Sequence, residues 1–222
     1  MFKLTPVIRE ISHECACLAQ KDNRPGIKIF FDAYNPDTEG KRTLIHYFTN
    51  GVFEFLNNEF DNSVRKEVYI ELNRNLPFKK RIDIIVIGEN GRVAIELKHN
   101  ADFGALSAAI IEIALAKKHG DNFKRIEDFE IRNDLSTKYY IFSSYGKSPK
   151  NTYEKQTEIL KKICYKCNNK SVEFANLIIF REDVMWDNGE IQSIENNEVF
   201  NNIYNNVKKH FDAIIKYCNY GP

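Results

Sequence analysis

An Asn-Gly dipeptide between two β-rich segments is the feature that most limits how this chain can fold. Residues 82–87 read Ile-Asp-Ile-Ile-Val-Ile, and residues 93–98 alternate apolar and polar side chains. Asn90-Gly91 between them is the strongest short signal for a two-residue β-hairpin turn, because both residue types tolerate the positive φ that such a turn requires. The sequence therefore predicts an antiparallel hairpin whose loop is Asn90 and Gly91.

The position of the loop determines which side chains of this hairpin share a face. With Asn90 and Gly91 as the loop, Asp83 faces Lys98, and Glu96 lies diagonally across from Asp83. Side chains alternate between the faces of a sheet, so we expect Asp83, Glu96 and Lys98 on one face. Diagonal neighbours lie roughly 7–8 Å apart, and two carboxylates at such a spacing can bind one hard divalent cation.

These residues resemble the active-site motif of the PD-(D/E)XK nuclease superfamily, which includes restriction endonucleases and Holliday-junction resolvases. The matching residues are Asp83 and, on the next strand, Glu96-Leu97-Lys98, while Ile82 stands where the family name has proline. The resemblance implies that Asp83 and Glu96 hold Mg²⁺ or Mn²⁺. It also implies that Lys98 positions or activates the water that attacks a phosphodiester bond.

The resemblance, which extends over residues 42–119, further implies a fold, a substrate and an oligomeric state. The superfamily core has the order α-β-β-β-α-β, and DNA is the expected substrate in preference to RNA. Such enzymes usually work as dimers, because a duplex has two strands to cut. An acidic residue on the first helix often completes the metal shell, and Glu54 is the best match, with Glu59 as a second choice. Glu67 and Glu71, on the strand before the hairpin, either point into the site or form a polar strand face.

Hydrophobic periodicity independently predicts the same order of elements. We expect, in chain order, a helix at 42–60, strands at 64–72, 82–87 and 93–98, a helix at 105–118 and a strand at 138–143. The strand at 64–72 alternates apolar and polar residues except at Lys66. The sequence therefore predicts an α/β fold with a central mixed β-sheet flanked by helices, as in a restriction-endonuclease-like core.

The remaining segments are expected to belong to the same domain. They comprise a helix at 7–20, a short strand or extended segment at 27–31, a helix at 153–166, a strand at 172–180, a turn at 188–189 and a helix at 199–217. A chain of 222 residues is long enough for one α/β domain over 1–222. We expect a nuclease-like core at about 42–143 and C-terminal additions at 144–222.

The charge of the chain is balanced overall and uneven locally. A net charge of +1 argues against a protein that coats nucleic acid non-specifically. Residues 138–170 nevertheless carry eight lysines and two glutamates, with tyrosines interleaved. This pattern suits a nucleic-acid surface, although a solvated helix face is its more common origin. The expected DNA contacts are Lys79, Lys80, Arg81, Lys147 and Lys150.

The N-terminus and the cysteines bear on location and metal content. Residues 1–10 lack the apolar region of a signal peptide, and no apolar run is long enough to span a membrane. We therefore expect a cytoplasmic protein without a membrane partner, in which the five cysteines are reduced. Cys15, Cys17, Cys164 and Cys167 could together bind zinc or an iron–sulfur cluster, but buried or unligated thiols fit their spacing better.

A second interpretation of the hairpin assigns it no chemistry. Glu96 and Lys98 would then be the outer side chains of an ordinary half-buried strand, and Asp83 with Lys98 a surface ion pair worth less than about 1 kcal/mol. The chain would be a non-catalytic module that binds nucleic acid or protein. The apolar neighbours of Asp83 favour the catalytic interpretation, because a carboxylate in a buried strand needs a partner or a metal.

Overall fold

The computed structural model of the chain describes residues 4–36, 43–71, 79–115, 135–168, 171–187, 190–194 and 196–222. The strands are β1 (Val64–Glu71), β2 (Lys79–Ile87), β3 (Arg92–Asn100), β4 (Thr137–Gly146), β5 (Val172–Phe180), β6 (Val184–Asp187) and β7 (Glu190–Ile194). The α-helices are α1 (Leu4–Lys21), α2 (Pro25–Tyr34), α3 (Leu44–Phe60), α4 (Phe103–Leu115), α5 (Lys150–Asn168) and α6 (Glu198–Tyr220).

The described strands form one five-stranded sheet and one small hairpin. The order in the large sheet is β1-β2-β3-β4-β5, while β6 pairs with β7. Antiparallel pairing joins β1 to β2 and β2 to β3, whereas β3, β4 and β5 run parallel. The predicted α/β fold with a central mixed sheet is therefore confirmed.

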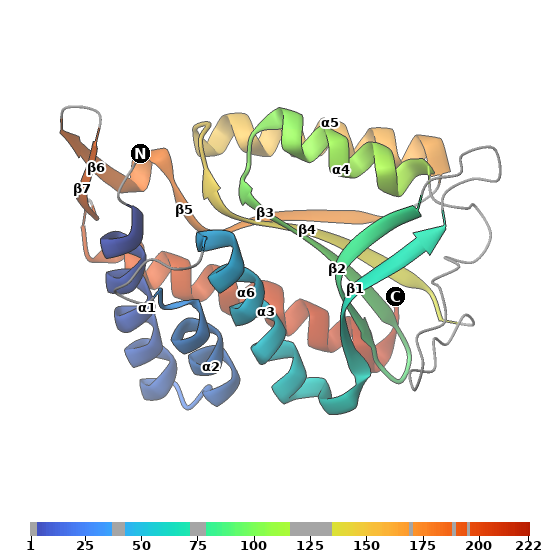
Figure 1. Cartoon of the computed structure of the whole chain (residues 1–222), viewed down its shortest axis with the longest axis horizontal. Helices are drawn as coiled ribbons and strands as arrows, with labels where there is room; N and C mark the ends of the chain where they lie inside the picture. The colour runs from blue at the N-terminus through green and yellow to red at the C-terminus, as the bar shows by residue number, and fades with distance from the viewer. Residues whose placement is uncertain are drawn as a thin grey trace.

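Helices cover both faces of the large sheet (Figure 1). α4 and α5 lie on one face, and α1, α2, α3 and α6 lie on the other. Buried apolar side chains accordingly form two clusters, one on each side of the sheet. We call the cluster beneath α1, α2, α3 and α6 the main core, and the other the α4–α5 core.

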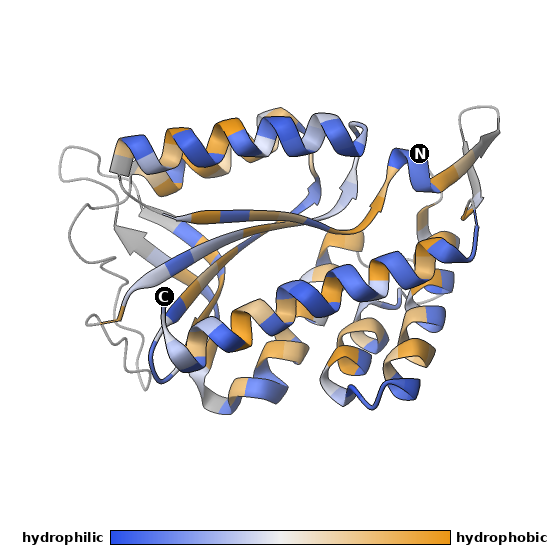
Figure 2. Ribbon diagram, turned by 180° about the vertical axis from the view of Figure 1, so that it is seen from behind, coloured by the Kyte–Doolittle hydropathy of each residue, from blue (hydrophilic) through white to orange (hydrophobic). Residues whose placement is uncertain are grey.

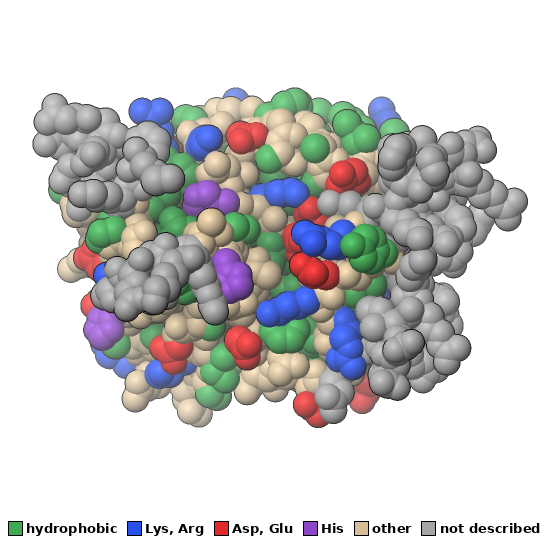
Figure 3. All heavy atoms as spheres, viewed as in Figure 1, with side chains coloured by type: hydrophobic (Ala, Val, Ile, Leu, Met, Phe, Trp, Pro, Cys, Tyr) green, Lys and Arg blue, Asp and Glu red, His purple; other side chains and the backbone are tan. Residues whose placement is uncertain are grey.

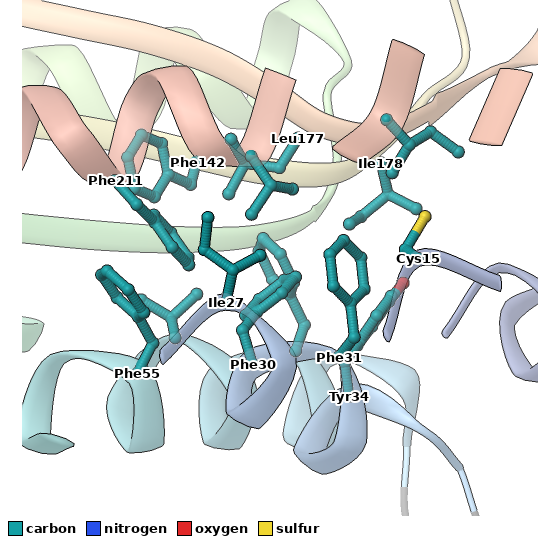
Figure 4. Close-up of a cluster of buried hydrophobic side chains, with 14 of the residues drawn as sticks. Cys15, Ile27, Phe30, Phe31, Tyr34, Phe55, Phe142, Leu177, Ile178 and Phe211 are labelled. Atoms are coloured by element: carbon teal, nitrogen blue, oxygen red, sulfur yellow. The ribbon is translucent and has the colours of Figure 1, made fainter. Parts of the chain in front are cut away.

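Aromatic side chains join the helices of the main core to one another (Figure 4). The ring of Phe55 on α3 stacks on that of Phe211 on α6, with their centroids 4.0 Å apart. Phe30 on α2 meets Phe211 edge-on at 5.1 Å. Each such pair adds about 0.5–1.5 kcal/mol beyond the burial of its area. α6 itself carries apolar and polar residues in alternating patches along its length, as an amphipathic helix does (Figure 2).

Most of the predicted elements are present with small changes at their ends. The helices predicted at 7–20, 42–60, 153–166 and 199–217 are α1, α3, α5 and α6, and the predicted strands are β1 to β5. The helix predicted at 105–118 is α4, of which residues 116–118 lie outside the described residues, as do Arg42, Leu72 and the turn at 188–189. No helix among the described residues is long and apolar enough to cross a membrane.

The prediction of a short strand or extended segment at 27–31 is wrong, because this segment belongs to helix α2. Its buried residues recur on one helical face, at Ile27, Phe30, Phe31 and Tyr34. Pro25 lies in the first turn, where the missing N–H is not needed and the fixed φ suits a helix. Residues 27–31 alone span little more than one helical turn, too few to show the helical period.

The two-residue turn predicted at Asn90 and Gly91 is also wrong. Neither residue has a positive φ, and Gly88 N donates to Gly91 O at 2.9 Å across a four-residue loop. Cys218 O, at the end of α6, accepts hydrogen bonds from Asn90 N at 2.9 Å and from Gly91 N at 3.2 Å. A Cβ on Gly91 would lie 2.4 Å from Tyr217 O. Glycine is therefore required here by the close approach of α6 rather than by turn geometry.

Candidate functional site

The sheet divides at Asp83, where β2 leaves β3. The β2–β3 pairing runs from Ile87 with Arg92 only as far as Ile84 with Ile95. By contrast, β2 stays paired with β1 to its first residue, and β3 stays paired with β4 to Asn100. Figure 1 shows the β1–β2 arm and the end of β3 leading in different directions. We call the place where they part the fork, formed by Asp83 on β2 and residues 96–98 on β3.

The β1–β2 arm turns over at the fork. Along β2, Ile84 packs in the main core, whereas Ile82 packs in the α4–α5 core, although both would share a face in a regular strand. On β1, Val64 and Val68 are divided between the two cores in the same way. The side chain of Asp83 is at the reversal and is half-buried.

The carboxylate of Asp83 reaches across to β3. Leu97 N donates a hydrogen bond to Asp83 Oδ2 at 2.7 Å. This bond stands where a regular ladder would supply a backbone acceptor from β2. Leu97 is the residue between Glu96 and Lys98, so the contact brings Asp83 beside both of them.

Glu96 and Lys98, which lie two residues apart on β3, form an ion pair. Ile95 and Leu97 pack in the main core, so Glu96 and Lys98 project toward the α4 side of the sheet. Lys98 Nζ lies 2.6 Å from Glu96 Oε1. The Glu96 side chain is 4% exposed and that of Lys98 is 27% exposed, so the lysine is the more accessible partner.

The predicted register of the hairpin is wrong by two residues. Ile85 pairs with Ala94 rather than with Glu96, because the four-residue loop replaces the two-residue turn. A shift of two preserves the face of every side chain, so Glu96 and Lys98 still share a face. Asp83 is not opposite Lys98 as predicted, and its contact is with the Leu97 amide instead.

His99 lies next to the fork and faces the opposite side from Lys98. Its Nδ1 lies 3.1 Å from Ser144 Oγ on β4, and Ser144 Oγ donates to His99 O at 3.1 Å. Burial lowers the pKa of His99, and the positive charge of Lys147 lowers it further. Lys147, one of the predicted DNA contacts, is exposed, and its effect on the pKa of His99 puts it near this end of β3.

Glu54 is exposed on α3, and its role as a metal ligand stays a prediction. Its negative charge acts on Lys66 of β1, where burial lowers the pKa and Glu54 and Glu67 oppose that shift. Lys66 Nζ lies 3.9 Å from the centre of the Phe53 ring and donates to Asn50 Oδ1 at 3.3 Å. The hydrogen bond and the ion pair at the fork do not involve Glu54.

Lys66 is a polar residue near the fork that was not among the predicted site residues. It pairs with Ile84, the neighbour of Asp83, and it is the position at which the alternation of β1 fails in the sequence. That irregularity was the available signal, because it marks the place where the arm turns over. In Figure 3, acidic and basic side chains gather in the middle of the face in view, between α3 and α4.

The other predicted DNA contacts are spread over the molecule. Arg81 Nη1 bonds to Glu67 Oε1 at 3.1 Å on the surface of the β1–β2 arm. Lys79 and Lys80 begin β2, but their side chains lie outside the described residues. Lys150, exposed at the start of α5, lines a groove of about 810 Å³ between α5, β5 and α6.

This groove does not have the positive surplus that the lysine-rich segment suggested. Its lining contains as many acidic side chains as lysines: Lys138, Lys150, Lys161 and Lys209 with Glu154, Glu158, Glu173 and Asp183. Glu173 binds both Lys161, at 2.7 Å, and Lys138, at 3.8 Å. The predicted nucleic-acid surface over this segment therefore stays a prediction.

The cysteines are not arranged as one metal site. Cys15 is buried in the main core and Cys164 in the α4–α5 core, on opposite sides of the sheet. Burial raises the pKa of the Cys15 thiol. Over the described ranges, no group of three or more His, Cys, Asp or Glu side chains is positioned to hold a metal ion.

No protein-family model matches the sequence, and comparisons with curated proteins and with solved structures give no significant match. A functional proposal for this chain therefore depends on the residues at the fork.

Proposed function

We propose that the protein is a metal-dependent nuclease that hydrolyses phosphodiester bonds at the fork, with DNA as the substrate in preference to RNA. The observation that carries this proposal is the hydrogen bond from Leu97 N to Asp83 Oδ2. It joins a half-buried carboxylate to the amide between Glu96 and Lys98. This contact supports a site in which an acid from β2 lies near an acid and an amine from β3.

The donor set at the fork suits a small hard cation. Mg²⁺ is usually held by one or two carboxylates, while water and substrate phosphate oxygens complete its shell. Asp83 and Glu96 supply those two carboxylates, so a third protein acid is not required. Bound there, Mg²⁺ or Mn²⁺ would lower the pKa of a coordinated water and neutralise charge on the phosphate.

Lys98 has the geometry to assist the same step. Its ammonium carries three N–H donors, of which one is directed to Glu96 Oε1. The others can donate to a phosphate oxygen or orient the attacking water, which stabilises charge that develops in the transition state. The partial exposure of Lys98 allows a substrate to reach it.

The test is a cleavage assay on plasmid DNA, on single-stranded DNA and on an RNA of matching sequence, each with Mg²⁺ or Mn²⁺. Removal of the Asp83 carboxylate in Asp83→Ala should lower the rate by roughly 100-fold or more, because metal-assisted catalysis contributes several kcal/mol. Chelation of the metal should abolish cleavage in the native protein. Size-exclusion chromatography of the same samples tests the expected dimer.

The matched control is Asp32→Ala. Asp32 is a carboxylate on α2 that pairs with Lys28 one turn away at 2.6 Å, and it is exposed. This variant should cut DNA at the native rate. Equal cleavage by native protein and Asp83→Ala, with both variants folded by circular dichroism, would contradict the proposal.

The burial of Glu96 favours a second candidate function. A carboxylate that is 4% exposed and paired to a lysine can be a structural ion pair in a non-catalytic module of the same fold. Such a module would bind DNA in a fluorescence-anisotropy assay and leave it intact with every divalent cation. In a nuclease, Glu96→Gln should abolish cleavage and retain DNA binding.

A further inference from the structure

Glu67 has a backbone conformation that is unusual for a residue in the middle of a strand. Its φ is +58°, in the left-handed region. Among the described residues, the other non-glycine positions with positive φ are Asn23, in the turn after α1, and Asp61, at the end of α3. Asn and Asp tolerate this region better than other side chains, and both positions are outside strands. Glu67 is neither Asn nor Asp and lies inside a strand, so its surroundings must impose the conformation.

The strained residue lies directly across from Asp83. In the β1–β2 ladder, Lys66 pairs with Ile84 and Val68 pairs with Ile82, and Glu67 and Asp83 are the opposed positions between these pairs. The same point is where both strands turn over from the main core to the α4–α5 core. A φ of +58° in place of about −140° rotates the chain by roughly half a turn about the N–Cα bond of Glu67, which accounts for the reversal of β1.

We propose that the left-handed conformation of Glu67 positions Asp83. It turns the β1–β2 arm over at the fork, so the Asp83 side chain is directed at the Leu97 amide and into neither core. Glu67 is a positioning residue in this proposal, and it acts through backbone geometry. The catalytic consequence rests on the proposed nuclease function, whereas the positioning of Asp83 does not.

The backbone of Glu67, rather than its carboxylate, carries this role. The carboxylate is paired with Arg81 at 3.1 Å, and both side chains are largely exposed, at 67% and 52%. An exposed ion pair of this kind contributes little to holding a strand. Glycine adopts the left-handed region without steric cost, alanine has the same Cβ cost as glutamate, and β-branched valine is disfavoured more than either.

The experiment compares Glu67→Gly, Glu67→Gln, Glu67→Ala and Glu67→Val. The first readout is the hydrogen-exchange protection of the Leu97 amide by NMR, which reports its hydrogen bond to Asp83. Asp83→Ala is the reference in which this protection is lost. The second readout is DNA cleavage with Mn²⁺. Glu67→Gly and Glu67→Gln should keep the Leu97 protection and cleave within about twofold of the native rate.

Glu67→Val should lose the Leu97 protection, and its cleavage rate should fall by about tenfold or more, because small misplacements of a catalytic group are costly. Glu67→Ala has a Cβ under the same restriction as that of glutamate, so it should behave like Glu67→Gln. Native protection in folded Glu67→Val, or loss of the protection in Glu67→Gly, overturns the proposal. Global unfolding of Glu67→Ala also overturns it, because the effect is assigned to Asp83 alone.

The two readouts separate this inference from the nuclease proposal. If native protein cleaves nothing but the Leu97 protection depends on residue 67 as described, the positioning role holds and the nuclease function fails. If cleavage occurs and is equal in Glu67→Gly and Glu67→Val, the positioning role fails and the nuclease function holds.

Discussion

The two ends of the β2–β3 hairpin are built in opposite ways. At the loop end, Gly88 and Gly91 pack against the last turn of α6, where Cys218 O accepts two backbone hydrogen bonds from the loop. At the fork end, the ladder stops after Ile84, and Asp83 uses a side-chain oxygen to bind β3. The loop end is held by backbone contacts and the fork end by charged side chains.

This difference shows how one strand pair can carry both stability and strain. A left-handed residue and a buried ion pair persist only where the rest of the fold fixes the strands. The loop end, together with the main core, does this for the fork. Changes at the loop end should therefore alter the free energy of unfolding most, and changes at the fork should alter chemistry most.

The largest expected effect on stability is at Gly88. A Cβ at this position would lie 2.3 Å from Cys218 O, so Gly88→Ala must displace the end of α6. Overpacking combined with loss of the hydrogen bonds to Cys218 should lower the free energy of unfolding by roughly 3–4 kcal/mol. Urea denaturation of the native protein and Gly88→Ala measures this loss.

The control for Gly88→Ala is Gly104→Ala. Gly104 is exposed in the first turn of α4, and an added Cβ would meet its nearest atom, Asp102 Oδ1, at 3.4 Å. Alanine should be tolerated there and stabilise the helix slightly. If both variants lose similar stability, the tight contact between the loop and α6 is not what holds the loop end.

His210 gives a second way to weaken the same helix. Burial, with a smaller contribution from the charge of Lys209, lowers its pKa to about 4, so the folded protein holds the ring neutral near pH 7. The unfolded chain binds its proton near pH 6.5, so stability is complete above that pH and is lost as pH falls toward the folded pKa. Between about pH 7 and pH 5 the loss should be roughly 1–2 kcal/mol.

His210→Gln isolates this contribution. The difference between native and variant free energies of unfolding should change with pH over that window, because the other histidines are common to both proteins. The hydrogen-exchange protection factor of the Asn90 amide, which bonds to α6, should fall in parallel in the native protein as pH falls. A pH dependence identical in the two proteins would exclude His210 as its source.

The sequence indicates the strands and helices well because their apolar periods are regular, as in β5 and α6. It does not reveal the loop end. Asn90 and Gly91 carry the signature of a tight turn, while their real constraint is Cys218 at the end of α6, more than 120 residues later in the chain. At the candidate site, the alternation placed Glu96 and Lys98 on one face. The contact of Asp83 with an amide depends on a backbone reversal that shows in sequence only as a polar residue at Lys66.

Asp83 should show the opposite behaviour to Gly88. Asp83→Ala removes the acceptor of the Leu97 amide, which should cost about 1 kcal/mol of unfolding free energy. Asp83→Asn keeps an oxygen that can accept this bond, so its cost should be smaller. Thermal melting in the absence of metal ranks the three proteins. A loss in Asp83→Ala as large as that in Gly88→Ala would mean that the fork is a structural element of the sheet.

The smallest expected effect is at the Arg81–Glu67 ion pair, on the fork side of the hairpin. Both side chains are mostly exposed, so Arg81→Gln should change the free energy of unfolding by less than about 0.5 kcal/mol. Added salt should leave the native protein and the variant equally stable, because the pair is already screened by solvent. A larger loss, removed by salt, would show that charge rather than the backbone of Glu67 holds the arm in its turned-over form. The ion pair would then turn the arm over at the fork, and the left-handed φ of Glu67 would be a consequence of that turn rather than its cause.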